Sequence, residues 1–156
     1  MRALWLTAGV VFALDQISKL YVVWGLGLAD ALRMDIWPPY LTFRMAWNRG
    51  VNFGLLSSDG DLGRWVLIGV SLAISAAVLI WMLRGRHRGV ALIAAGCLIG
   101  GALGNVVDRL VYGAVADFLN MSCCGIDNPY AFNVADIAIF AGALGLVAFT
   151  GDEKTP

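Results

Sequence analysis

The sequence predicts an all-α integral membrane protein, with four transmembrane helices and a small extracytoplasmic β-hairpin or cradle. Three observations predict this fold class: an apolar composition, four long apolar stretches, and one segment in which apolar and polar residues alternate. Of the 156 residues, 60% are apolar and 14% are charged, and the mean hydropathy is +0.76. Soluble globular domains have a more polar composition than this. We therefore expect a single membrane domain over residues 1–156.

Four apolar stretches are long enough to cross a membrane, because about 20 helical residues span the roughly 30 Å of hydrocarbon. They lie near 3–24, 64–83, 89–108 and 132–150. The first stretch also has features of a cleavable secretory signal, since Met1 and Arg2 precede its apolar run. A removable leader has no use for Asp15 and Lys19 within its core. We expect this stretch to remain as a span.

The basic residues predict the orientation. With four spans both termini lie on one side, and the basic residues other than Lys19 divide five against five. The short link between the second and third spans contains Arg84, Arg86 and Arg88, and basic residues in short loops have the largest influence on orientation. We therefore expect the termini and this link in the cytoplasm. Residues 25–63 and 109–131 would face outward.

Residues 40–56 have the pattern of strands rather than of a span. Apolar residues occupy every second position from Leu41 to Trp47, which is the period of a half-buried strand. Residues 48–50 supply a turn before a second alternating run at 51–55. We expect a hairpin that lies on the outer membrane surface or on the helix ends. An ordinary loop with chance alternation is the alternative.

Rare residue types exclude several kinds of chemistry. The single histidine, His87, belongs to the cytoplasmic link, which excludes a Ser-His or Cys-His nucleophile at the outer face and an HExxH metal site. Cys97, Cys123 and Cys124 fit neither a disulfide framework nor a zinc ligand set, and we expect free thiols. The net charge of zero gives no indication of a nucleic-acid partner. We expect no metal and no cofactor.

Glycines recur every four residues in the third span, at Gly96, Gly100 and Gly104. This spacing places them on one helical face, where a second backbone can approach closely. We expect this face to pack against another helix.

Ionisable and polar groups gather at one predicted depth. In a helix that enters from the cytoplasm, Asp15 lies roughly 18 Å along the first span. Lys19 lies one turn further along the same face, where the two side chains can partly neutralise each other. The other groups at this level end or follow the third span, or lie in the first turns of the fourth: Asp108, Arg109, Asp117, Asn133 and Asp136. We expect all of them to converge on the outer third of the bilayer.

Pairing these charges leaves two acids over. If Lys19 neutralises its neighbour on the first span and Arg109 neutralises Asp108, then Asp117 and Asp136 have no cation. Two carboxylates in a low-dielectric pocket share a proton and titrate as a unit. Such a pair activates water: one carboxylate takes a proton from the attacking water, and the other donates to the developing oxyanion. The charges therefore predict a peptide hydrolase with an aspartic dyad.

Four other interpretations are open. The charges could form a structural network that holds the helices together. A small proton-coupled membrane transporter also uses intramembrane acids, spaced through the full membrane depth. A non-catalytic assembly factor would grip its partner with the glycine face. Finally, a Ser-Lys dyad could use Lys19, although neighbouring Ser18 points elsewhere on the helix.

Over nearly the whole chain, the sequence resembles the lipoprotein signal peptidases, or signal peptidase II, which are membrane aspartic endopeptidases of bacteria. The motifs that carry the resemblance occur in the family's order and spacing. They are DQISK at 15–19, NRGVNFG at 48–54, GGALGNVVDR at 100–109, VADF at 115–118 and FNVAD at 132–136. The family usually has a small residue where Asn52 stands, which leaves open how this strand contacts substrate.

The resemblance implies that Asp117 and Asp136 are the catalytic pair. It implies supporting or substrate-binding roles for eight further residues: Asp15, Lys19, Asn48, Gly50, Asn105, Asp108, Arg109 and Asn133. The implied substrate is a prolipoprotein whose lipobox cysteine already carries diacylglycerol, cut on the amino side of that cysteine. Membrane lipid is the other implied partner. The site would then lie just inside the outer face of the membrane.

Overall fold

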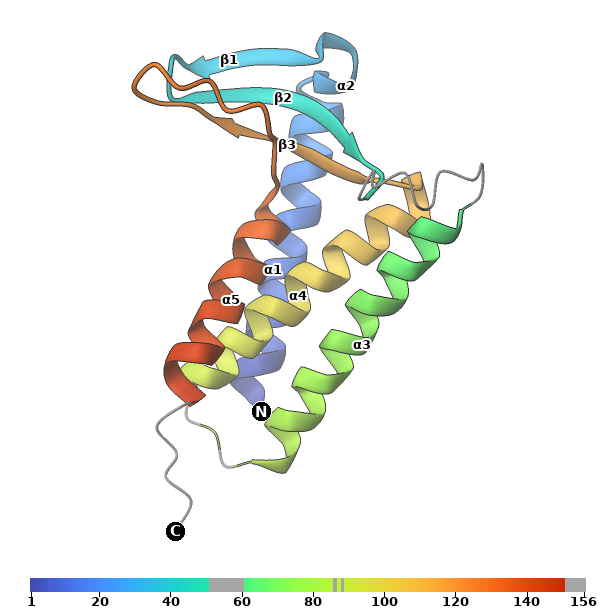
Figure 1. The fold of residues 1–156 in the computed structure, drawn as a ribbon, viewed down its shortest axis with the longest axis vertical. Coiled ribbons are helices and arrows are strands. Elements are labelled where there is room, and N and C mark those ends of the chain that lie inside the picture. Colours follow the sequence, from blue (N-terminus) through green and yellow to red (C-terminus); the bar gives the residue numbers. More distant parts are fainter. Residues whose placement is uncertain (51–60, 86, 88, 151–156) are drawn as a thin grey trace.

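The computed structural model describes residues 1–50, 61–85, 87 and 89–150. Its long helices run side by side, and a small sheet crosses one end of them (Figure 1). These helices are α1 (Arg2–Lys19), α3 (Leu62–Arg84), α4 (Gly89–Tyr112) and α5 (Val134–Thr150). A π-helical segment, η1 (Leu20–Gly25), continues α1, and the short helix α2 (Leu28–Ala31) follows it. The end with the sheet is called the sheet end below.

Three helices are long and apolar enough to cross a membrane: α1 together with η1, α3, and α4. Helix α5 is also apolar but has 17 residues. At about 1.5 Å per residue it is roughly 26 Å long, slightly less than the hydrocarbon thickness of about 30 Å. The fold is therefore mostly helical with three candidate spans, and α5 is shorter than the fourth span expected at 132–150.

The glycine face predicted in the third span is confirmed as a contact with α1. A Cβ atom added to Gly96 would lie 2.6 Å from the backbone oxygen of Leu4, and one added to Gly100 would lie 2.5 Å from that of Ala8. At Gly104 the added atom would lie 2.5 Å from a carboxylate oxygen of Asp15. Small residues thus allow α1 and α4 to pack backbone against backbone.

Helix α5 packs on another side of α4 by the same means. A Cβ atom on Gly101 would lie 2.6 Å from the backbone oxygen of Ala135, and one on Gly142 would lie 2.6 Å from that of Ala94. Helix α3 packs against α4 and stands apart from α1 and α5 (Figure 1). The centre of the helical layer is therefore α4, which is the most buried of the candidate spans.

The sheet is antiparallel, with the strand order β1-β2-β3. Strand β1 is Arg33–Trp37, β2 is Leu41–Asn48 and β3 is Val115–Met121. Strand β2 thus occupies the alternating run of the sequence, but its partners come from outside 40–56. Its first partner, β1, comes just before it in the chain. The 37–40 segment, Trp-Pro-Pro-Tyr, makes the turn that joins the two strands. The second arm of the expected hairpin, at 51–55, lies outside the described residues, as does Asn52.

An apolar cluster fixes the sheet on the end of the first helix. Val23 and Leu28 are buried there against Phe118 of β3. The ring of Phe118 meets that of Phe43 of β2 edge to face, with centroids 5.8 Å apart. This cluster holds β3, and with it Asp117, close to the helices.

The expectation of three free thiols is wrong for two of them. A disulfide joins Cys123 to Cys124, and Cys97 in α4 is free. The two neighbours lie in a tight turn in which Cys123 and Ile126 exchange backbone hydrogen bonds. Cys124 has a φ of 59° there, a left-handed conformation that adjacency in the sequence does not reveal.

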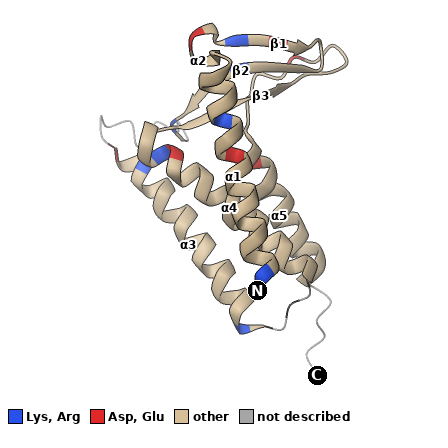
Figure 2. Ribbon diagram, turned by 180° about the vertical axis from the view of Figure 1, so that it is seen from behind, with Lys and Arg blue, Asp and Glu red and all other residues tan. Residues whose placement is uncertain are grey.

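Charged side chains gather near the two ends of the molecule (Figure 2). Helix α1 begins with Arg2 and α3 ends with Arg84 at the end opposite the sheet, where His87 contacts Trp81 of α3. Within the described residues, the other charges of α1, α3 and α4 lie toward the sheet end (Figure 2). The uneven distribution agrees with a polar site at one depth.

Candidate active site

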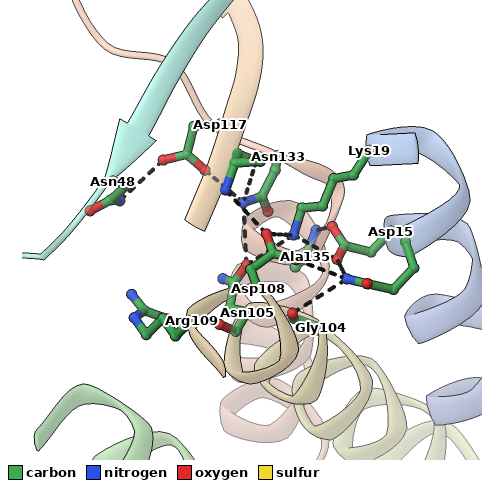
Figure 3. A network of polar contacts seen from close by, with 12 residues as sticks. Asp15, Lys19, Asn48, Gly104, Asn105, Asp108, Arg109, Asp117, Asn133 and Ala135 are labelled. Carbon is green, nitrogen blue, oxygen red and sulfur yellow. Dashed lines mark hydrogen bonds and ion pairs between the residues drawn. The ribbon is translucent and has the colours of Figure 1, made fainter. Parts of the chain in front are cut away.

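A buried polar network lies where α1, α4, β3 and the start of α5 meet (Figure 3). Its members come from four separate segments of the chain. Six of its side chains are buried, with at most 7% exposed: Asp15, Lys19, Asn105, Asp108, Asp117 and Asn133. Asp136, in the first turn of α5, is half-buried. The predicted convergence of polar groups is therefore present.

Lys19 is shared between two carboxylates. Its Nζ atom lies 2.7 Å from Asp15 and 2.8 Å from Asp108. The predicted pair of Asp15 and Lys19 is thus confirmed, whereas the predicted pair of Asp108 and Arg109 is wrong. Neighbouring residues of a helix point in different directions, so Asp108 faces α1 and Arg109 does not.

Arg109 instead lies in the electrostatic environment of the two acids that the sequence left unpaired. Its guanidinium donates to the backbone oxygen of Asn105 at 3.3 Å and interacts at longer range with Asp136 and Asp117. Neither of these acids forms an ion pair with any described residue. The charge count is therefore corrected: the two acids lack a direct ion pair, but a cation is near.

Asn133 binds both acids. Its side-chain amide donates to Asp117 at 2.6 Å. Its side-chain oxygen accepts from the backbone N–H of Asp136 at 2.8 Å, and its own backbone N–H donates to the Asp136 carboxylate at 3.2 Å. Asn105 adds a hydrogen bond of 2.9 Å to the same carboxylate. Asn105 and Asn133, two of the residues expected to support the acids, thus make direct contact with them.

A turn after β2 orients the other side of Asp117. Asn48 donates to Asp117 at 3.1 Å, and the backbone N–H of Gly50 donates to the side chain of Asn48 at 3.0 Å. Gly50 has a φ of 102°, which disfavours residues with a Cβ atom. Gly50 therefore acts on the site through Asn48.

The environment of Asp117 alters its protonation. Burial first, and then the nearby charge of Asp136, raise the pKa of this carboxyl to about 6. Hydrogen bonds from Asn48 and Asn133 oppose this shift because they stabilise the ionised form. A carboxyl that titrates near pH 6, with a second carboxyl bound to the same Asn133, is suited to general acid–base chemistry.

One side chain in the network was not among the predicted site residues. Gln16 donates to Asp15 and to Asp108, at 3.1 Å each. Its position next to Asp15 in the DQISK motif was the available signal. Backbone N–H groups of Ala116 and Ala135 also enter the network, and their side chains carry no signal of it.

The Ser-Lys alternative has no geometric basis. Ser18 donates to the backbone oxygen of Asp15 at 2.8 Å, while the Lys19 amine is held by two carboxylates. An ammonium that neutralises two buried acids is not available as a general base.

Comparison with known proteins gives a consistent family. The family model described as signal peptidase (SPase) II matches residues 7–150. A lipoprotein signal peptidase of Methylorubrum extorquens (strain PA1) is 46% identical over 137 residues, which are 86% of this chain and 77% of the relative. One of Caulobacter vibrioides (strain ATCC 19089 / CIP 103742 / CB 15) is 38% identical over 150 residues, covering 94% and 86%.

Solved structures agree with these relatives. A bacterial membrane enzyme solved by the in meso method at 1.9 Å resolution has a TM-score of 0.79 and 25% identity, covering 96% of this chain and 92% of its own. A second, at 2.3 Å resolution, has a TM-score of 0.75 and 26% identity, with coverage of 97% and 91%. Neither the transporter nor the assembly factor finds support among these proteins. The family model, the relatives and the fold agree, and the chain belongs to the signal peptidase II family.

Proposed function

We propose that this protein is an aspartic endopeptidase that removes the signal peptide from diacylglyceryl-modified prolipoproteins, cutting on the amino side of the lipidated cysteine. The observation that carries the catalytic type is the meeting of Asp117 and Asp136 at Asn133. The family supports peptide hydrolysis, and the name of the relatives supports a prolipoprotein substrate.

The two carboxyls divide the proton transfers of hydrolysis between them. Asp117, with its raised pKa, holds the proton of the dyad, and Asp136 is the base. Asp136 takes a proton from water as the water oxygen attacks the peptide carbonyl, and Asp117 donates its proton to the carbonyl oxygen. When the C–N bond breaks, the leaving amine takes the proton from Asp136, and Asp117 recovers its own from the collapsing intermediate.

The proposed membrane placement follows from the apolar helices. We take α5 as a fourth span together with the residues just before it, because its 17 residues come close to the membrane thickness. The arginines of the α3–α4 link support a bacterial inner membrane protein with both termini in the cytoplasm. In this orientation the sheet end faces outward, and a lipid-anchored scissile bond reaches the dyad from the membrane.

Isosteric replacement of the acids tests the catalytic type. We expect Asp117→Asn and Asp136→Asn in purified enzyme each to abolish cleavage of a diacylated prolipoprotein, because the amide neither takes nor donates the required proton. Asp35→Asn is the matched control, since Asp35 forms an exposed ion pair with Arg33 on β1. Cleavage at near wild-type rate by either dyad variant would rule out the mechanism.

The substrate class needs a separate experiment. One precursor is prepared with and without diacylglycerol on its cysteine, and both forms are offered to the enzyme in the same detergent. We expect cleavage of the lipidated form alone, because the lipid brings the scissile bond to the depth of the dyad. Equal cleavage of both forms would contradict the proposed substrate while leaving the dyad intact.

A further inference from the structure

The segment that carries Asp117 is attached to α4 through its backbone. The N–H of Ala116, directly before Asp117, donates to the carboxylate of Asp108 at 3.1 Å. Ala116 is 2% exposed and Asp108 is 1% exposed, so water does not compete for this hydrogen bond. The bond fixes the peptide group next to the first dyad acid.

The segment that carries Asp136 is attached to α1 in the same way. The N–H of Ala135, directly before Asp136, donates to the carboxylate of Asp15 at 2.9 Å. Ala135 and Asp15 are fully buried. Each dyad acid therefore follows a peptide group that is bound by a carboxylate of a different helix.

Two side chains of α1 join these two carboxylates to each other. Lys19 lies 2.7 Å from Asp15 and 2.8 Å from Asp108. Gln16 donates to both, at 3.1 Å each. An unbroken chain of buried polar contacts thus runs from the backbone beside one dyad acid to the backbone beside the other (Figure 3).

We propose that Asp15, Gln16, Lys19 and Asp108 form a crosspiece that sets the separation of the two dyad carboxyls. They are positioning residues, since they reach the acids through the peptide groups of Ala116 and Ala135. The proposal rests on the proposed function, because the separation matters only if the two acids act together.

Stability alone is a weak explanation for this arrangement. The desolvation of buried charges offsets most of their attraction, so a buried ion triad adds little to the free energy of unfolding compared with apolar side chains of similar volume. What it supplies is direction and distance, because each contact joins defined atoms. The dyad needs this, since a misplacement of about 1 Å lowers catalysis by about 100-fold.

Gln16→Met is the sharpest test, because it removes the amide bridge and keeps the side-chain length and both ion pairs. We expect kcat to fall about 10-fold, in proportion to a displacement smaller than 1 Å, with KM changed by less than about 2-fold. Crystal structures of wild type and variant should show a changed separation of the Asp117 and Asp136 carboxyls. An unchanged separation and an unchanged kcat would overturn the proposal.

A double-variant cycle tests whether Asp15 and Asp108 control one shared separation of the dyad carboxyls or support the two acids independently. Asp15→Asn and Asp108→Asn each loosen one end of the crosspiece, and each should lower kcat. If both act on one distance, the double variant falls at most about 2-fold below the worse single variant. A multiplicative loss would contradict the crosspiece.

Controls keep this test distinct from general damage and from the proposed function. Asp35→Asn makes the same chemical change on an exposed ion pair and should leave kcat unaltered. Parallel losses of kcat, substrate affinity and thermal midpoint in Gln16→Met would indicate structural damage and count against positioning. Normal cleavage by the dyad variants would refute the proposed function. Normal cleavage by the crosspiece variants alone would refute the crosspiece and leave the proposed function standing.

Discussion

The side-chain amide of Asn133 lies 2.6 Å from the carboxylate of Asp117. Asn133 directly precedes the first turn of α5, so this hydrogen bond joins the start of the helix to strand β3. Because Asn133 also exchanges hydrogen bonds with Asp136, one residue orients both acids. The relationship explains how two acids from separate segments come to share one environment.

Asn133→Ala should therefore impair the reaction more than the fold. It removes the donor to Asp117 and the acceptor for Asp136, and we expect at least about a 100-fold loss in kcat, since one positioned donor at a reacting group contributes about 100- to 1,000-fold. The cost to stability should be about 1–3 kcal/mol, because buried partners lose their hydrogen bonds. Cleavage assays and thermal unfolding in detergent measure the two effects.

Asn128→Ala is the matched control for Asn133. The Asn128 side chain accepts a backbone hydrogen bond from Tyr130 in the loop after β3, away from the dyad. It should leave kcat near the wild-type value. Equal cleavage rates for the two alanine variants would remove Asn133 from the site.

The pKa of Asp117 predicts a pH-dependent stability. Below about pH 4 the carboxyl is protonated in both the folded and the unfolded protein, and above about pH 6 the folded protein must hold it ionised in a buried site. The raised pKa therefore stabilises the fold at low pH, and this contribution is lost as pH rises from about 4 to about 6. A shift of about two units corresponds to about 3 kcal/mol.

Asp117→Asn should remove this dependence. At pH 7 the variant should unfold at a higher temperature than wild type, because it has no buried charge at this position. The loss of one hydrogen bond from Asn48 or Asn133 makes this increase smaller. Near pH 4 its advantage should disappear. Thermal midpoints of both proteins from pH 4 to pH 7 provide the measurement, and parallel curves would show that the pKa of Asp117 is not raised.

Close helix packing predicts a contrast between two glycines. Gly100→Ala should destabilise the protein by about 1–3 kcal/mol, the usual cost of overpacking, because its Cβ atom would lie 2.5 Å from the backbone oxygen of Ala8. Gly69→Ala in α3 should be neutral or slightly stabilising, because nothing lies within 4 Å of its Cβ position. Thermal unfolding of the pair in one detergent checks the contrast, which fails if both variants behave alike.

Removal of the shared cation should be costly. Lys19→Ala leaves Asp15 and Asp108 buried without a counter-ion, and we expect a loss of about 3–5 kcal/mol at pH 7. The loss should shrink at low pH, because protonated carboxyls need no counter-ion. The folded fraction at several pH values reports on this, and wild-type behaviour of the variant at high pH would refute the role of Lys19.

Some features of the molecule follow from the sequence because they are local. The contact of Asp15 with Lys19 follows from a spacing of four residues in a helix, and the glycine face of α4 follows from the same geometry. The alternation in 41–47 gave the position of β2. These predictions depend on the 3.6-residue and two-residue periods of the backbone, which nearby residues determine.

Other features depended on which segments pack together, and only the tertiary structure decided them. Asp108 pairs with Lys19 rather than with Arg109 because α1 and α4 meet at their glycine face. The partners of β2, the bridging role of Gln16 and the contacts of both dyad acids with Asn133 join residues that are far apart in the chain or presented by different elements. Sequence determined which chemical groups lie near the same end of the helices, because the rise per residue sets how far along its helix each one lies. Packing decided which of them touch, because contact depends on directions that no single segment specifies.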